Sequence, residues 1–167
     1  MKQAVNILIK ENKRIRDIRK KYLLEYKKYK FHITLVYPFE IKNQEQLIEH
    51  INKSAKRIKP FNLILSGLKK SAREYYLYLL IKEGKKEIMV LYKNLNRGVL
   101  KGFQNKNLPR YIPHVTLGGF RSKKEIDKVI NSLKNQKISL SARINSIQLL
   151  TLNKDMSIKS IKNFKLK

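Results

Sequence analysis

The chain has 167 residues, of which 42% are hydrophobic and 31% charged, and it contains no cysteine. These values exclude an intrinsically disordered chain, a disulfide scaffold and any chemistry that needs a cysteine thiolate or a cysteine metal site. The apolar runs are far shorter than the ~20 residues that span a bilayer. We expect one globular domain over residues 1–167, and a cytoplasmic location because the N-terminus lacks a signal-peptide pattern.

Basic residues greatly outnumber acidic ones. There are 39 Lys and Arg against 12 Asp and Glu, which gives a formal net charge of +27. A field of this size attracts polyanions, so RNA or a nucleotide is the partner that we expect, with no membrane association. The same excess also fits a general bias of the composition toward Lys, Ile and Asn. The charge by itself therefore leaves both explanations open, and we expect a monomer.

The first half of the chain is predicted to form a strand, a helix, a strand, a helix and two strands. Hydrophobic periodicity places them at residues 5–9, 13–24, 31–39, 43–59, 61–65 and 75–82. Asn43 is a typical N-cap for the second helix, which Pro60 is expected to end. A loop containing Ser66 and Gly67 is expected to join the last two strands.

The second half repeats the order of helix, strand, helix and further strands. The predicted elements are a helix at 87–100 that ends near Gly102, an irregular basic loop at 101–110, a strand at 111–117, a helix at 123–134, and strands at 138–143, 146–152 and 157–164. Ser122 is expected to cap the second of these helices, with Glu125 three residues later. The repeat predicts an α+β fold with two similar lobes that face each other across a pseudo-two-fold axis.

A short motif occurs once in each half. His32 stands two residues before Thr34, and His114 stands two residues before Thr116; a leucine follows each threonine. Only three threonines exist in the chain, so two such pairs are improbable by chance. On a strand, residues i and i+2 point to the same face and their neighbours point to the other, which we expect to be the core. Two imidazoles and two hydroxyls would then meet in one cleft, a set that suits phosphate chemistry.

These motifs, the 82-residue separation of their histidines and the order of elements resemble the two-histidine (2H) phosphoesterase superfamily. The 2′-5′ RNA ligase-like and RNA 2′,3′-cyclic phosphodiesterase branch is the most similar, and Tyr37-Pro38-Phe39 and Pro113 strengthen the likeness. The resemblance implies a bilobal fold of two antiparallel-sheet lobes, with helices outside and a central groove. It also implies action on a cyclic phosphodiester of ribose without metal or cofactor. Many members carry a basic residue after the second motif, where this chain has Gly118 and Gly119.

The residues themselves suit such a reaction. An imidazole titrates near pH 6.5, so one histidine can accept a proton while the other donates one. We expect His32 and His114 to be this catalytic pair, with either one as the base, and Thr34 and Thr116 to donate hydrogen bonds to the phosphate. The third histidine, His50, is predicted to be a surface or boundary residue.

Further residues near the motifs are weaker candidates for substrate contact. Aromatic side chains stack on the bases of single-stranded RNA, and cations pair with its phosphates. The candidates are Phe31, Tyr37, Tyr111, Phe120 and Arg121, whereas Tyr75, Tyr76 and Tyr78 are expected to be strand packing. Two alternatives remain beside an enzyme for RNA ends. One is a phosphodiesterase for a small cyclic nucleotide such as a cyclic phosphate of ADP-ribose, and the other is a non-catalytic RNA-binding module.

Overall fold

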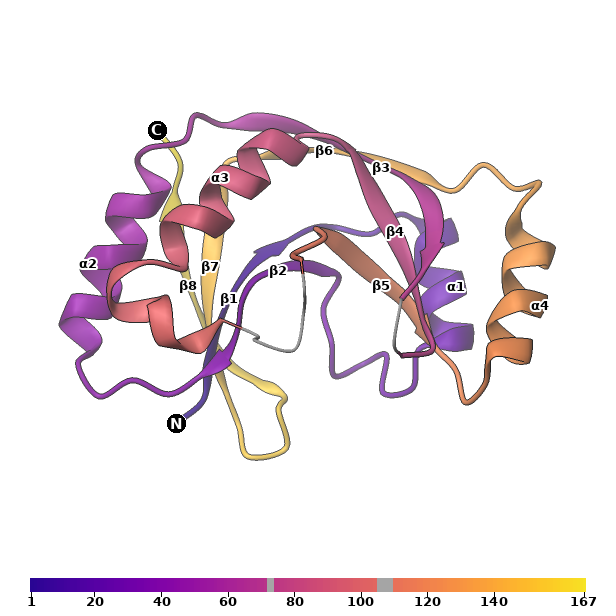
Figure 1. Ribbon diagram of the computed structural model, residues 1–167, viewed down its shortest axis with the longest axis horizontal. Coiled ribbons are helices and arrows are strands. Elements are labelled where there is room, and N and C mark those ends of the chain that lie inside the picture. The colour runs from indigo at the N-terminus through magenta and orange to yellow at the C-terminus, as the bar shows by residue number, and fades with distance from the viewer. Residues whose placement is uncertain (72–73, 105–109) are drawn as a thin grey trace.

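Two four-stranded antiparallel sheets form the framework of the protein (Figure 1). The computed structural model describes residues 1–71, 74–104 and 110–167. The first sheet has the order β2-β1-β7-β8, built from His32–Phe39, Gln3–Leu8, Ser146–Leu152 and Ile158–Lys165. The second has the order β5-β4-β3-β6, built from His114–Gly119, Tyr76–Glu83, Phe61–Lys70 and Ser139–Ile144. The predicted α+β fold with two antiparallel-sheet lobes is confirmed.

The strands that carry the two motifs, β2 and β5, are the edge strands of their sheets. They contact each other in the middle of the molecule, where the two lobes meet (Figure 1). The motif histidines are the first residue of each strand. Elements from the two halves of the sequence therefore bring equivalent positions to the same central region.

The helices lie outside the sheets, and two of them cross to the opposite lobe. Helix α1 (Lys13–Tyr22) follows β1 of the first sheet but packs on β5 of the second. Helix α3 (Lys85–Leu95) follows β4 of the second sheet but packs on β2 of the first, beside α2 (Gln44–Ala55). Figure 1 shows α1 with α4 (Lys123–Leu133) at one end and α2 with α3 at the other. This exchange ties the lobes together. No helix among the described residues is long and apolar enough to cross a membrane.

Both motif strands alternate between buried and half-buried residues, as the two-residue period predicts. Ile33, Leu35 and Leu117 have no exposed surface, and Val115 is 1% exposed. The histidine and threonine of each motif are half-buried on the other face. Burial of these aliphatic side chains holds each strand in register, because a slip of one residue would send them out of the core.

The predicted helix caps are confirmed. The side chain of Asn43 accepts a hydrogen bond from the amide of Gln46 at 3.0 Å, and Ser122 accepts one from the amide of Glu125 at 3.2 Å. The carboxylate of Glu125 in turn accepts from the amide of Arg121 at 2.9 Å. These bonds satisfy amides that have no partner within the helix.

Several predicted boundaries are wrong. The second motif strand begins at His114 instead of residue 111, and the first helix ends at Tyr22 instead of residue 24. Ser66 and Gly67 form no loop, because β3 continues through them with an irregular register, and Gly67 takes a positive φ of 91° that suits a bulge. Helix α2 ends at Ala55 instead of residue 59. A turn from Ala55 to Ile58 follows the helix and buries the isoleucine.

Helix α3 ends at Leu95 instead of residue 100, and a 3-10 helix, Gly98–Phe103, follows it. The side-chain amide of Asn96 donates to the carbonyls of Tyr92 and Leu35 and so ties the helix end to β2. Within the predicted basic loop, residues 105–109 lie outside the described residues. His50 is a boundary residue, as predicted: its Nε2 donates to the Leu95 carbonyl at 2.9 Å.

Candidate active site

The two motif histidines are anchored in the same way. Nδ1 of His32 donates to the carbonyl of Lys30 at 2.6 Å, and Nδ1 of His114 donates to the carbonyl of Ile112 at 2.6 Å. A carbonyl can only accept, so each Nδ1 carries a proton and Nε2 of the neutral ring keeps its lone pair. In each case the anchor is the carbonyl two residues earlier. The sequence repeat is therefore a repeat of geometry, with both Nε2 atoms suited to exchange protons.

The segment before His32 is held by a buried arginine that sequence analysis did not find. Arg19 of α1, 2% exposed, pairs with Glu11 at 2.5 Å and donates to the carbonyl of Tyr29 at 2.8 Å. Its guanidinium also lies 5.2 Å from the ring centre of Phe31. Phe31 is only 3% exposed, so the expectation that it stacks on a base is wrong. Arg19 therefore supports the segment that leads into the first motif through Tyr29 and Phe31.

The second motif histidine rests on an aromatic ring. Tyr78 of β4 stacks on His114 with 3.6 Å between ring centroids and 25° between ring planes. Tyr78 faces Thr116 across the β4–β5 ladder. Sequence analysis assigned Tyr78 only to strand packing, because nothing local shows which side chain lies across a ladder. The contact restricts the orientation of the imidazole.

Both imidazoles lose protons more readily than a free histidine. Burial lowers the pKa of His32, the Lys30 carbonyl opposes this, and the charge of Arg19 lowers the pKa further. Burial also lowers the pKa of His114; its carbonyl partner raises it, and the positive charge of His32 lowers it. The two rings are thus close enough for one to disfavour protonation of the other. Burial is the largest cause for both rings, so each favours its neutral form more than a free histidine does.

A tyrosine joins the two motifs directly. The hydroxyl of Tyr111 donates to the backbone carbonyl of Thr34 at 2.8 Å. Its ring stacks on Tyr92 of α3, with 3.8 Å between centroids and 2° between planes. Tyr111 directly precedes Ile112, the residue that anchors His114. One hydrogen bond therefore links the support of the second histidine to the strand of the first.

A cleft of about 2180 Å³ opens between the lobes and runs toward α1 and α4. His32 of the first motif and Val115 and Thr116 of the second line it. Three of the candidate contacts also line it, namely Tyr37, Phe120 and Arg121. Of the described candidates, His114, Thr34 and Tyr111 are not part of this lining. Burial raises the pKa of Tyr37 to about 12, so its phenol stays protonated and can donate.

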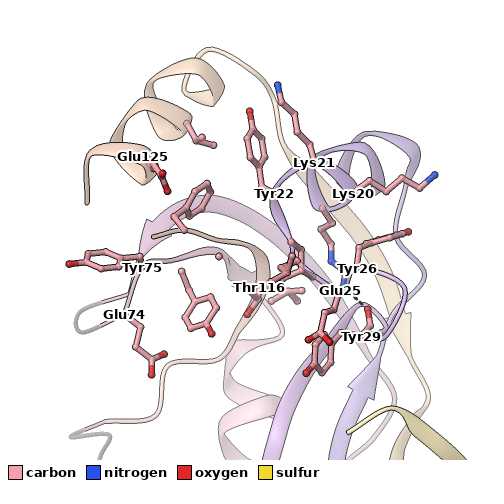
Figure 2. Close-up of a pocket in the computed structure, with 18 of the residues that line it drawn as sticks. Lys20, Lys21, Tyr22, Glu25, Tyr26, Tyr29, Glu74, Tyr75, Thr116 and Glu125 are labelled. Carbon is pink, nitrogen blue, oxygen red and sulfur yellow. Dashed lines mark hydrogen bonds between the residues drawn. The ribbon is translucent and has the colours of Figure 1, made fainter. Parts of the chain in front are cut away.

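Tyr75 and Tyr76 also line the cleft, which corrects their assignment to strand packing. They are 48% and 39% exposed. In Figure 2, Tyr75 lies to one side of Thr116, whereas Tyr26 and Tyr29 lie to the other. Periodicity could not indicate this exposure, because it depends on where β4 begins relative to the cleft. Among the described residues, no three His, Asp or Glu side chains gather as a metal site would require.

Comparison with known proteins identifies relatives in sequence and in fold. A candidate phosphoesterase of Bacillus licheniformis is 28% identical over 150 residues, covering 86% of this chain and 87% of that protein. Escherichia coli LigT complexed with 3′-AMP superposes with a TM-score of 0.55 at 17% identity, covering 100% of this chain and 97% of that one. Kluyveromyces marxianus Usb1 with uridine monophosphate superposes with a TM-score of 0.56 at 12% identity, covering 99% of this chain and 98% of that one.

The family model for the 2′-5′ RNA ligase superfamily matches residues 9–156, a span that includes both histidine motifs. The solved structures share the fold of this protein from end to end. The chain belongs to the 2′-5′ RNA ligase superfamily, the 2H phosphoesterases.

Proposed function

We propose that this protein is a metal-independent phosphoesterase that opens 2′,3′-cyclic phosphates at RNA ends to 2′-phosphates. The observation that carries the proposal is the matched pair of imidazoles, each with Nδ1 bonded to a carbonyl at 2.6 Å. The candidate phosphoesterase among its relatives supports ester chemistry. The nucleotides bound to LigT and Usb1 support a nucleotide ligand.

The two histidines divide the proton transfers between them. The neutral ring removes a proton from water at Nε2, and the oxygen of that water forms a bond to phosphorus. The bond from phosphorus to the ribose O3′ breaks, and the protonated ring donates its Nε2 proton to O3′. The product has a 2′-phosphate and a free 3′-hydroxyl. Each transfer contributes about 10²- to 10⁴-fold in rate, and either histidine can take either part.

Thr34 and Thr116 are proposed to bind the phosphate. Each lies two residues after a catalytic histidine on the same face of its strand. A threonine hydroxyl donates one hydrogen bond, and the non-bridging oxygens of the phosphate carry the charge that must be stabilised during transfer. Because the protein supplies both proton carriers and these donors, the reaction does not require a metal-activated water.

The same residues also serve 2′-5′ ligation. If the 5′-hydroxyl of a second RNA strand attacks in place of water, it gives its proton to the neutral ring, O3′ leaves with the proton of the other ring, and a 2′-5′ phosphodiester forms. Hydrolysis and ligation therefore differ only in the attacking oxygen. Water is far more abundant, so hydrolysis is the reaction that we expect to dominate.

The test is turnover of an oligonucleotide with a 2′,3′-cyclic phosphate in the presence of EDTA, with identification of the product against 2′- and 3′-phosphorylated standards. We expect a 2′-phosphate from the parent protein. H32A and H114A should each lose at least about 100-fold in kcat/KM. H50A is the matched control, since it removes the third imidazole, which is bonded to Leu95 away from the motifs.

Each alternative gives a different result. A small-molecule enzyme would turn over a cyclic phosphate of ADP-ribose but leave the oligonucleotide intact. A binding module would retain RNA without turnover, and with an affinity that H32A and H114A do not change. Loss of activity in EDTA with recovery on adding a divalent cation would contradict the metal-independent mechanism.

A further inference from the structure

The cleft is larger than one reacting nucleotide requires. Its volume is about 2180 Å³, whereas pockets for small ligands usually have about 300–1,000 Å³. His32 and Thr116 lie at one part of it, and the rest extends between α1 with the loop that follows it and α4. A cyclic mononucleotide bound at the histidines would leave most of this space empty. The extra space suits a longer ligand.

The side chains of this extension include four aromatic rings, which we call the aromatic wall: Tyr22, Tyr75, Tyr76 and Phe120. Tyr75 and Tyr76 are among the few large apolar side chains that are exposed in the described part of the chain, at 48% and 39%. Tyr22 and Phe120 pack together at 5.8 Å between centroids. Exposed rings next to a cleft provide free faces on which flat groups can stack.

Two consecutive glycines allow these rings to lie against β5. A Cβ atom at Gly118 would lie 2.8 Å from Cβ of Tyr22, and one at Gly119 would lie 3.0 Å from the ring of Tyr76. A side chain at Gly118 would displace α1 at Tyr22, and one at Gly119 would displace the Tyr76 ring. The strand that follows Thr116 is therefore covered by aromatic rings from neighbouring elements instead of by side chains of its own.

Positive charge surrounds the same extension. Exposed basic side chains on the cleft lining come from both sides of it: Lys20, Lys21, Lys27, Lys30, Arg121 and Lys128. In Figure 2, Lys20 and Lys21 extend from α1 toward the outer edge of the site. Three carboxylates also line the cleft: Glu25, which pairs with Lys28, Glu125, which accepts the amide of Arg121, and the exposed Glu74. The exposed basic side chains outnumber them. The extension combines stacking faces with this group of cations, which we call the basic rim.

We infer that the aromatic wall is a stacking subsite for nucleotides on the 5′ side of the reacting one, so that the enzyme favours single-stranded oligonucleotides over mononucleotides. This inference rests on the proposed function. Aromatic rings with interleaved cations bind single strands by stacking bases and neutralising phosphates, with little dependence on sequence. The identity of the bases is therefore of minor importance, and the length of the strand decides the affinity.

The first experiment compares kcat/KM for a cyclic mononucleotide and for cyclic-phosphate oligonucleotides of two and four residues. The parent should prefer the tetranucleotide by about 5- to 100-fold, the effect of one stacked base or more. Y75A should lower the ratio of tetranucleotide to mononucleotide by a similar factor, through KM, and Y75F should restore it. I161A, an exposed apolar side chain on β8, is the matched control and should keep the ratio of the parent.

The second experiment tests the basic rim. The slope of log kcat/KM against log salt for the tetranucleotide should become less steep in K20Q/K21Q, by about 0.7 for each phosphate that no longer pairs with a lysine. K159Q/K162Q, which removes two exposed lysines from β8 at the far edge of the first sheet, should keep the parental slope. Equal slopes in the two double variants would contradict the basic rim.

Failure of the subsite and failure of the proposed function give different results. If the parent turns over mononucleotide and tetranucleotide equally well, or if Y75A lowers both equally, the subsite is wrong and the proposed function stands. If neither substrate turns over, binding of a 2′-phosphorylated tetranucleotide is measured by fluorescence anisotropy. The subsite is supported if the tetranucleotide binds more tightly than the mononucleotide and if Y75A removes this difference. It is overturned if the parent binds both with equal affinity.

Discussion

The hydrogen bond from Tyr111 to Thr34 makes a quantitative prediction about how the lobes hold the two motifs. Y111F removes one hydroxyl and keeps the ring that stacks on Tyr92. The half-buried Thr34 carbonyl then loses a donor at 2.8 Å. A hydrogen bond of this kind contributes about 0.5–1.5 kcal/mol, and leaving its acceptor unpaired raises the loss toward about 1–3 kcal/mol. We expect Y111F to lose about 1–2 kcal/mol of unfolding free energy.

This loss corresponds to a fall in Tm of about 2–8 °C for a chain of this length. Activity should fall as well, because the bond joins the support of His114 to the strand of His32, and misplacement of a catalytic group by about 1 Å lowers the rate by up to about 100-fold. We expect kcat to fall about tenfold with little change in KM. Thermal unfolding and steady-state kinetics with the cyclic mononucleotide measure the two effects.

Y92F is the matched control, because it removes a phenol hydroxyl from the same stacked pair but leaves the bond of Tyr111 intact. It should keep the kcat of the parent and lower Tm less than Y111F does. If Y111F and Y92F have the same Tm and the same kcat, the hydrogen bond neither stabilises the contact between the lobes nor positions the histidines, and the reasoning is refuted.

The site and its supports allow four more predictions. Because the pKa values of His32 and His114 are both lowered from 6.5, the pH profile of kcat/KM should centre below pH 6.5, and a centre above pH 7 would contradict the assignment. The unfolded chain binds these protons more readily, so the unfolding free energy should fall as the pH drops through 6.5, and fall less in H32A/H114A. G118A should lower Tm, because its Cβ would meet α1 at 2.8 Å, whereas G102A, with open space around it, should not. Y78L should lower kcat about 2- to 10-fold by removing the ring stacked on His114, and a parental kcat would show that the stack has no role.

The parts of the fold that local chemistry decides could be predicted from the sequence. The alternation of Ile33 and Leu35 with His32 and Thr34 depends only on the two-residue period of a strand, and burial follows it. The cap at Asn43 depends on a side chain and an amide three residues apart. The repeat of the elements, with one motif in each half, led to the two lobes.

Features that depend on distant contacts could not be predicted. Helix α1 crosses to β5 because Gly118 leaves room for Tyr22, a contact between residues far apart in the sequence. Tyr78 reaches His114, and Arg19 supports the first motif, only after the sheet and helix have assembled. The same limit explains the bulge in β3, where continuing the ladder outweighs the turn preference of Ser66 and Gly67. Periodicity identifies the face of an element and not its neighbour.

The central claim is that two imidazoles from opposite lobes act on a single phosphate. A crystal structure with a bound 2′-phosphorylated nucleotide tests it most directly. The account predicts that Nε2 of His32 and Nε2 of His114 both lie within hydrogen-bond distance, about 2.6–3.2 Å, of oxygens on the same phosphorus. A phosphate that contacts only one of the two histidines, with the other directed elsewhere, would contradict the account.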